Sequence, residues 1–147
     1  MKTLWDSSVR EDLARRLDRL KPETSALWGR MNASQMVVHV ADWFKMATGQ
    51  LPTASRKLPI RFTPLKQFII YGPPFPKNVP TAPELLVRQC EDWDTECASL
   101  KETMNSFGSL PPGIELPGHP AFGRLSRRAW GVLGYRHMDH HFRQFGI

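Results

Sequence analysis

The sequence predicts a single all-α domain, built as a bundle of four main helices with long proline-rich connecting loops. Apolar residues recur three and four positions apart in four segments, which is the spacing of one face of a helix. Proline and glycine separate these segments, and the chain shows no βαβ alternation. A chain of 147 residues suits one domain with one hydrophobic core, so we expect residues 1–147 to fold as one unit.

The first helix is expected to begin at Ser7 or Ser8 and to end near Leu20. Asp6 and both serines are good N-cap residues, and Pro22 stops the helix. Its apolar stripe is Val9, Leu13, Leu17 and Leu20.

The second helix should follow Asn32 or Ser34 as its N-cap and end near Thr48, with Gly49 just beyond. A histidine lies among the apolar residues of its inward stripe, which is Met36, His39 or Val40, Trp43 and Ala47. We therefore expect His39 to face the core.

Prolines interrupt the pattern between residues 51 and 80. Residues 64–71 are expected to form a short helix and residues 72–80 an ordered loop, because proline removes backbone donors and fixes φ. The third main helix has the clearest start, since Thr81 and Glu84 form a capping box, and Gly108 ends it. Its stripe is Leu86, Cys90, Trp93, Cys97, Leu100, Met104 and Phe107.

Cys90 and Cys97 are the two cysteines of the chain, and they lie seven residues apart in this predicted helix. Their Cα atoms would be about 10.5 Å apart, which is too far for a disulfide. We therefore expect two reduced core cysteines, in agreement with a cytoplasmic protein.

A second loop, residues 109–125, leads to the last helix, which Ser126 caps and which ends near Phe145. Polar residues again share the inward stripe, which is Trp130, Leu133, His137, His141 and Gln144.

The formal net charge of +6 raises the question of an acidic partner. The basic residues are scattered, however, with no Lys/Arg block interleaved with aromatic residues, so we expect no nucleic-acid partner. No apolar run approaches the ~18 residues of a membrane span, and residues 1–6 lack a secretory signal. These features favour a cytoplasmic protein that does not enter a membrane.

The histidines carry the strongest functional signal. His137 and His141 are four residues apart on one helix face, so their imidazoles can reach a common ion. His39, from the inner face of another helix, is the natural third ligand. Three protein ligands leave positions open, as in catalytic metal sites. The alternative is that each histidine is a core residue with its own hydrogen bond.

The sequence offers further polar residues with several possible roles. His140 is a fourth ligand, a group that orients a ligand, or a surface residue. Asp42 orients an imidazole, acts as a base, or is solvated. His119 is expected in a loop, and Asp139 is expected to be exposed to solvent.

Several segments together resemble the DinB-like superfamily, in a subfamily of unknown function. They are residues 28–31 (WGRM) with 35–39 (QMVVH), residues 74–84 (PFPKNVPTAPE), and residues 119–126 (HPAFGRLS) with 130–131 and 135–146. The resemblance spans about residue 10 to the C-terminus. It implies an up-down-down-up four-helix bundle, a nickel- or zinc-type site with His39, His137 and His141 as ligands, and a homodimer. Relatives in the superfamily include S-transferases and isomerases that use a low-molecular-weight thiol.

Three functions are consistent with these residues. The first is a metal-dependent transferase acting on a small thiol, with Arg136 or Arg143 holding a carboxylate of the thiol or substrate. The second is a zinc-type hydrolase with Asp42 as its base. The third is a metal- or ligand-binding protein without catalysis, in which His140 closes the site.

Overall fold

The computed structural model describes residues 1–56, 58–77 and 83–147, and within them the chain is all-helical. Five α-helices and two short 3₁₀ helices are formed in this part of the chain, with no β-strand. Their bounds are α1 Ser7–Leu17, α2 Ala33–Ala47, η1 Pro59–Arg61, α3 Leu65–Tyr71, η2 Pro83–Leu86, α4 Trp93–Gly108 and α5 Arg127–Gln144. The predicted all-α class is confirmed.

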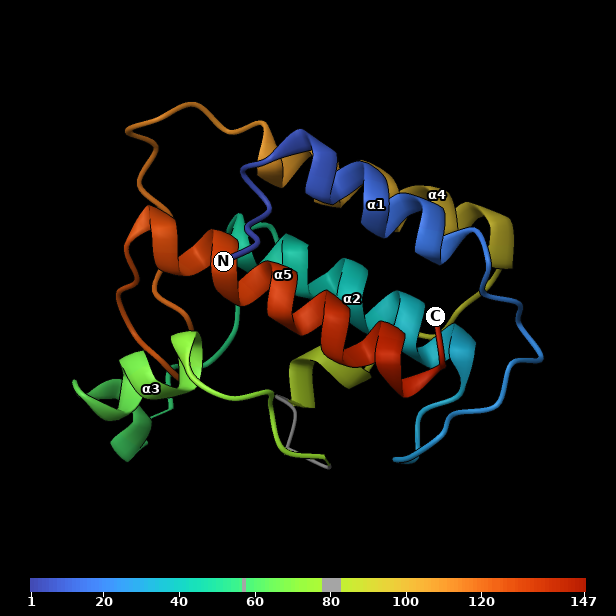
Figure 1. Cartoon of the computed structure of the whole chain (residues 1–147), viewed down its shortest axis with the longest axis horizontal. Helices are drawn as coiled ribbons and strands as arrows, with labels where there is room; N and C mark the ends of the chain where they lie inside the picture. The colour runs from blue at the N-terminus through green and yellow to red at the C-terminus, as the bar shows by residue number, and fades with distance from the viewer. Residues whose placement is uncertain (57, 78–82) are drawn as a thin grey trace.

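The four longer helices surround one hydrophobic core. α1 and α4 lie side by side along one side of the molecule, and α2 and α5 run beneath them (Figure 1). α2 contacts both α4 and α5, and α1 contacts the same two helices. The shorter α3 packs on η1 and α5 at one end. Large fully buried side chains fill the centre, among them Phe44, Phe107, Trp130 and Phe142.

Helix capping explains why α2 and α5 begin where they do. The side chain of Asn32 accepts a hydrogen bond from Gln35 N, and the Gln35 side chain accepts one from Asn32 N, which makes a complete capping box for α2. Ser126 caps α5 through a bond from Ala129 N to its Oγ. Both starts agree with the sequence, as does the short helix α3.

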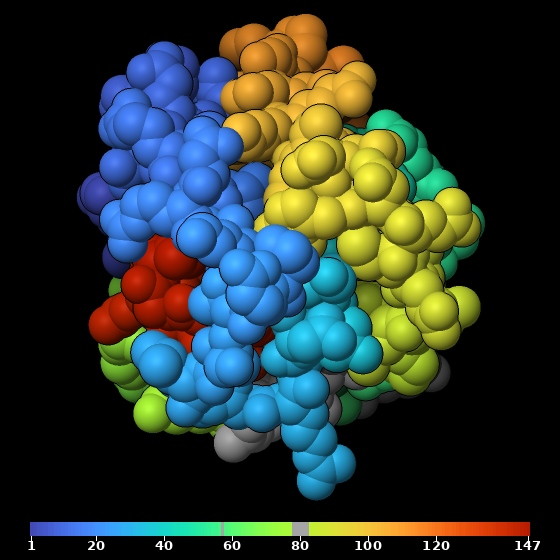
Figure 2. All heavy atoms as spheres, turned by 90° about the vertical axis from the view of Figure 1, so that its right-hand side faces the viewer, coloured from blue at the N-terminus to red at the C-terminus, as the bar shows by residue number. Residues whose placement is uncertain are grey.

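The segment between α1 and α2 covers one end of the molecule, next to the C-terminal residues (Figure 2). Leu27 N donates to the Gln144 carbonyl over 2.7 Å, which ties this segment to the end of α5. α1 itself ends at Leu17 rather than Leu20, although Leu20 is buried as predicted.

The prediction for the third main helix was wrong at its start. α4 begins at Trp93, where the Asp92 side chain accepts from Thr95 N. Residues 83–86 make only a 3₁₀ turn, residues 87–92 are not helical, and Leu86 is 55% exposed. Thr81, the predicted N-cap, lies outside the described residues.

Arg88 explains why the helix does not extend back to residue 83. Its guanidinium reaches the buried carboxylates of Asp42 and Glu96, and this holds the residues before α4 in a non-helical path. Cys90 therefore precedes α4 instead of sharing a helix with Cys97. Both thiols are free and half-buried; Cys97 packs against the hydrophobic core, as predicted, and burial raises its pKa to about 11.

In the described ranges, none of the helices combines the length and apolar character that crossing a membrane requires.

Candidate metal centre

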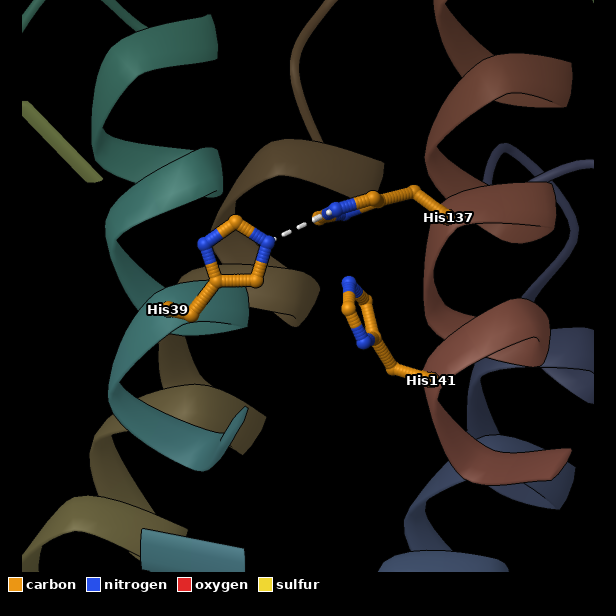
Figure 3. Close-up of side chains that lie close together, drawn as sticks. All are labelled: His39, His137 and His141. Atoms are coloured by element: carbon orange, nitrogen blue, oxygen red, sulfur yellow. Dashed lines mark hydrogen bonds between the residues drawn. The ribbon is translucent and has the colours of Figure 1, made fainter. Parts of the chain in front are cut away.

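The three predicted histidines meet between α2 and α5. His39 comes from α2, and His137 and His141 come from α5 (Figure 3). The Nε2 atoms of His39 and His137 are 3.1 Å apart, and the ring nitrogens that the three residues offer all lie within 4.8 Å of one another. Such a cluster could hold a metal ion. The i, i+4 spacing on α5 brings its two rings to one face, as the sequence predicts.

Hydrogen bonds to the outer nitrogens fix how two of the rings face the cluster. His39 Nδ1 lies 3.3 Å from the Leu85 carbonyl oxygen, and His141 Nδ1 lies 2.9 Å from Gln144 Oε1. Gln144 Nε2 donates to the Trp28 carbonyl over 2.7 Å, which identifies Oε1 as the acceptor. Since both acceptors need a proton from Nδ1, the Nε2 lone pairs of His39 and His141 are left for the cluster.

His137 differs from the other two histidines because its outer ring nitrogen has no hydrogen-bond partner among the described residues. Its ring lies against the indole of Trp43, with ring centroids 5.2 Å apart. Its Nδ1 is buried and has no hydrogen-bond partner among the described residues, while its Nε2 faces that of His39. If Nε2 donates to His39, the Nδ1 lone pair stays buried and unpaired; if it does not, two lone pairs oppose each other.

A divalent cation removes this conflict, because it accepts the facing lone pairs. Imidazole nitrogen suits zinc, nickel, copper and iron, so the donor set fits a transition metal without selecting one. The residues present therefore fit the ion that the sequence predicts.

Burial keeps the three imidazoles neutral, as metal ligands must be. Desolvation lowers the pKa of His39 to about 4 and that of His141 to about 3. Desolvation, together with the neighbouring histidines, also lowers the pKa of His137 well below its ordinary value. At neutral pH no imidazolium has to lose its charge before an ion binds.

A cleft of about 1140 Å³ lies beside the cluster on the His141 side. His140, His141 and Gln144 line it from α5, opposite residues of the 28–35 and 85–90 segments. His140 does not belong to the group of converging nitrogens, and its ring centroid lies 5.3 Å from that of His141. The sequence left its role open, and the structure places it in the wall of the cleft.

Asp42 is buried and held in ion pairs, which contradicts the solvated role that the sequence offered. It is 4% exposed and pairs with Arg88 over 3.0 Å and with Lys45 over 3.4 Å. It is neither solvated nor hydrogen-bonded to His39. Arg88 also contacts Glu96, so one guanidinium joins two buried carboxylates and secures the segment whose Leu85 carbonyl orients His39.

The other two polar residues singled out in the sequence lie outside the cluster. His119 is in a loop, where its Nδ1 accepts from the backbone N–H groups of Ala121 and Phe122 over 3.1 and 3.3 Å. Asp139 is partly buried rather than exposed, and it pairs with Arg16 over 2.8 Å. Sequence reasoning missed Leu85 and Arg88; Gln144 was on the predicted stripe, three residues after His141.

Comparison with known proteins places the chain in a family. No curated protein and no solved structure matched it. A family model does match residues 7–146, and the chain belongs to that family, described as "Protein of unknown function (DUF1569)".

Proposed function

We propose that this protein is a divalent-metal-dependent enzyme, with His39, His137 and His141 as ligands of nickel or zinc, acting on a small thiol as an S-transferase. The observation that carries the proposal is the convergence of neutral imidazole nitrogens beside a cleft of about 1140 Å³. We also propose that the chain is a member of the DinB-like superfamily and that its helices form the up-down-down-up bundle of that superfamily.

The chain prepares the site through contacts that surround the ligands. The Leu85 carbonyl and Gln144 hold the outer nitrogens of His39 and His141, and Trp43 supports the ring of His137. When bound, the ion would act as a Lewis acid that lets a thiol react as its thiolate at neutral pH. Three protein ligands leave positions for substrate, and the cleft gives access to them.

The structure favours this reaction over hydrolysis with Asp42 as the base. The Asp42 carboxylate is engaged by Arg88 and Lys45, and no carboxylate residue lines the cleft in the described part of the chain. A closed, non-catalytic site would need a fourth ligand, and His140 lies outside the cluster. Both observations support an open site that takes substrate.

Metal analysis tests the proposal directly. We would purify the chain without an affinity tag, load it with nickel or zinc, remove free ion and measure the metal content. We expect about one equivalent in the wild type and in His140→Ala, and a small fraction of that in His137→Ala and His141→Ala. His140→Ala is a matched control, since it removes an imidazole from the same helix.

Cobalt substitution then tests the open position. Adding 2-mercaptoethanol to the cobalt-loaded protein should produce a sulfur-to-metal charge-transfer band. Metal-free wild type after loading would overturn the whole proposal. A loaded protein without a spectral response to thiols would instead support a metal-binding protein that is not an S-transferase.

A further inference from the structure

A second, smaller cleft lies on the other side of His140. Its volume is about 480 Å³, and its walls include Trp28, Phe75, Lys77, Arg136, His140 and Arg143. Trp28 and His140 also line the larger cleft, so the two clefts share a wall. His140 is adjacent to His141 of the histidine cluster, which places this second cleft one side chain away from the candidate metal centre.

The cleft combines positive charge with aromatic surfaces. The ammonium of Lys77 lies 4.7 Å from the centre of the Trp28 ring, and the guanidinium of Arg136 lies 4.8 Å from the centre of the Phe75 ring. The exposed Arg143 adds a third cation. Asp139 is the one acidic residue in the described lining, and it pairs with Arg16 over 2.8 Å and with Arg143 over 3.8 Å. The lining therefore keeps an excess of positive charge.

Arg136 is held in place before any ligand binds. One Nη donates to the Gly72 carbonyl over 2.7 Å, and the other donates to the Pro73 carbonyl. These bonds fix the plane of the guanidinium and leave further N–H groups for a ligand, because the group carries five. A fixed guanidinium loses little side-chain entropy when it binds an anion.

We infer that this second cleft binds the carboxylate of the substrate, whose reactive end occupies the larger cleft beside His141. The inference rests on the proposed function, and it adds a substrate class, an organic carboxylate with an apolar body. A planar carboxylate matches the donor pattern of a guanidinium. The faces of Trp28 and Phe75 suit a carbon skeleton next to it.

The aromatic walls of the cleft favour an organic carboxylate over inorganic phosphate. Phosphate has no carbon skeleton to place against Trp28 and Phe75, whereas an organic carboxylate brings one next to its charged group.

Binding of a simple pair of probes tests the inference. Benzoate and its neutral analogue benzamide would be titrated into the full-length protein by calorimetry, with inorganic phosphate as a third probe. We expect benzoate to bind more tightly than both. Lys77→Gln and Arg143→Gln should each weaken benzoate by roughly 3–10-fold. Arg19→Gln removes the same charge at an exposed site outside the cleft and should change benzoate binding less than about twofold.

The outcomes separate this inference from the proposed function. Equal affinity for benzoate and benzamide, no binding of benzoate, or tighter binding of phosphate would each overturn it. Metal content would be measured on the same variants. Normal loading with lost benzoate binding in Lys77→Gln and Arg143→Gln supports an anion site distinct from the ligands. Benzoate binding in a chain that takes no metal would overturn the link to the metal centre.

Discussion

Gln144 determines how His141 faces the cluster. Its side chain accepts a hydrogen bond from His141 Nδ1 and donates one to the Trp28 carbonyl, so it joins the last turn of α5 to the segment before α2. Gln144 is 5% exposed, so water cannot easily replace these bonds. Partners of this kind fix the tautomer and orientation of a ligand.

We predict that Gln144→Leu lowers metal affinity by about 10–100-fold, because His141 loses the acceptor that fixes its proton on Nδ1. Affinity would be measured by competition with a chromophoric chelator. Gln144→Glu keeps the acceptor for His141 Nδ1 but not the donor to the Trp28 carbonyl, so it should recover part of the loss. Unchanged affinity in Gln144→Leu would show that Gln144 does not position the ligand.

His119 illustrates a histidine whose role is structural. Burial lowers its pKa to about 4, and its Nδ1 accepts two backbone N–H groups, which only the neutral ring can do. In the unfolded chain, His119 therefore takes up a proton near the ordinary pKa of 6.5. In the folded chain, it takes up this proton only near pH 4. The stability from the neutral ring is present above pH 6.5 and is lost as pH falls towards 4.

We predict that His119→Gln makes unfolding less sensitive to acid. Between pH 7 and pH 4 the wild type should lose up to about 3 kcal/mol more unfolding free energy than the variant. The variant retains the histidines of the metal cluster, so the difference isolates His119. Urea unfolding of the metal-free proteins at both pH values measures it, and equal losses would contradict the assignment.

At the scale of the elements, local signals predicted the helices that carry the site. Asn32 and Ser126 mark the starts of α2 and α5, and their apolar stripes identify the inner faces. Because His39, His137 and His141 lie on those faces, their meeting followed from helical geometry and the packing of α2 against α5.

Contacts between distant segments could not be predicted in the same way. Arg88 binds two carboxylates that are 46 and 8 residues away, and the Leu85 carbonyl meets a histidine 46 residues away. The spacing of apolar residues within one segment does not indicate which polar residue of another segment will contact it. The apolar spacing of Leu86 and Cys90 indicated a helix, while the partners of Arg88 favoured a non-helical path.

The start of α4 can be tested at its cap. Asp92→Ala removes the side chain that accepts from Thr95 N, so we predict that the midpoint of thermal unfolding falls by about 3–5 °C. Glu91→Ala removes the neighbouring exposed carboxylate, which has no cap bond, and should leave the midpoint nearly unchanged. Equal effects in calorimetry would place the start of the helix elsewhere.

At the scale of the whole molecule, the residues before α1 join three helices. Leu4 N donates to the Gly131 carbonyl in α5, and the Trp5 ring stacks on Phe107 of α4 with centroids 4.9 Å apart. A Cβ at Gly134 would lie 2.6 Å from Leu4 and 3.1 Å from Trp43, so α5 needs a glycine where these side chains meet it. The same Trp43 supports His137, which connects this packing to the site.

Leu4 should therefore contribute to the stability of the fold as a core residue does, although it is close to the end of the chain. Leu4 is fully buried, and we predict that Leu4→Ala lowers the unfolding free energy by about 2–4 kcal/mol. Leu27→Ala is the matched control, since Leu27 is 69% exposed and its loss should cost no more than about 0.5 kcal/mol. Urea unfolding of both variants measures the difference. Because Leu4→Ala removes no metal ligand, its metal content should match the wild type while it is folded. A similar small effect in both variants would mean that the packing of residues 1–6 on α5 does not stabilise the fold.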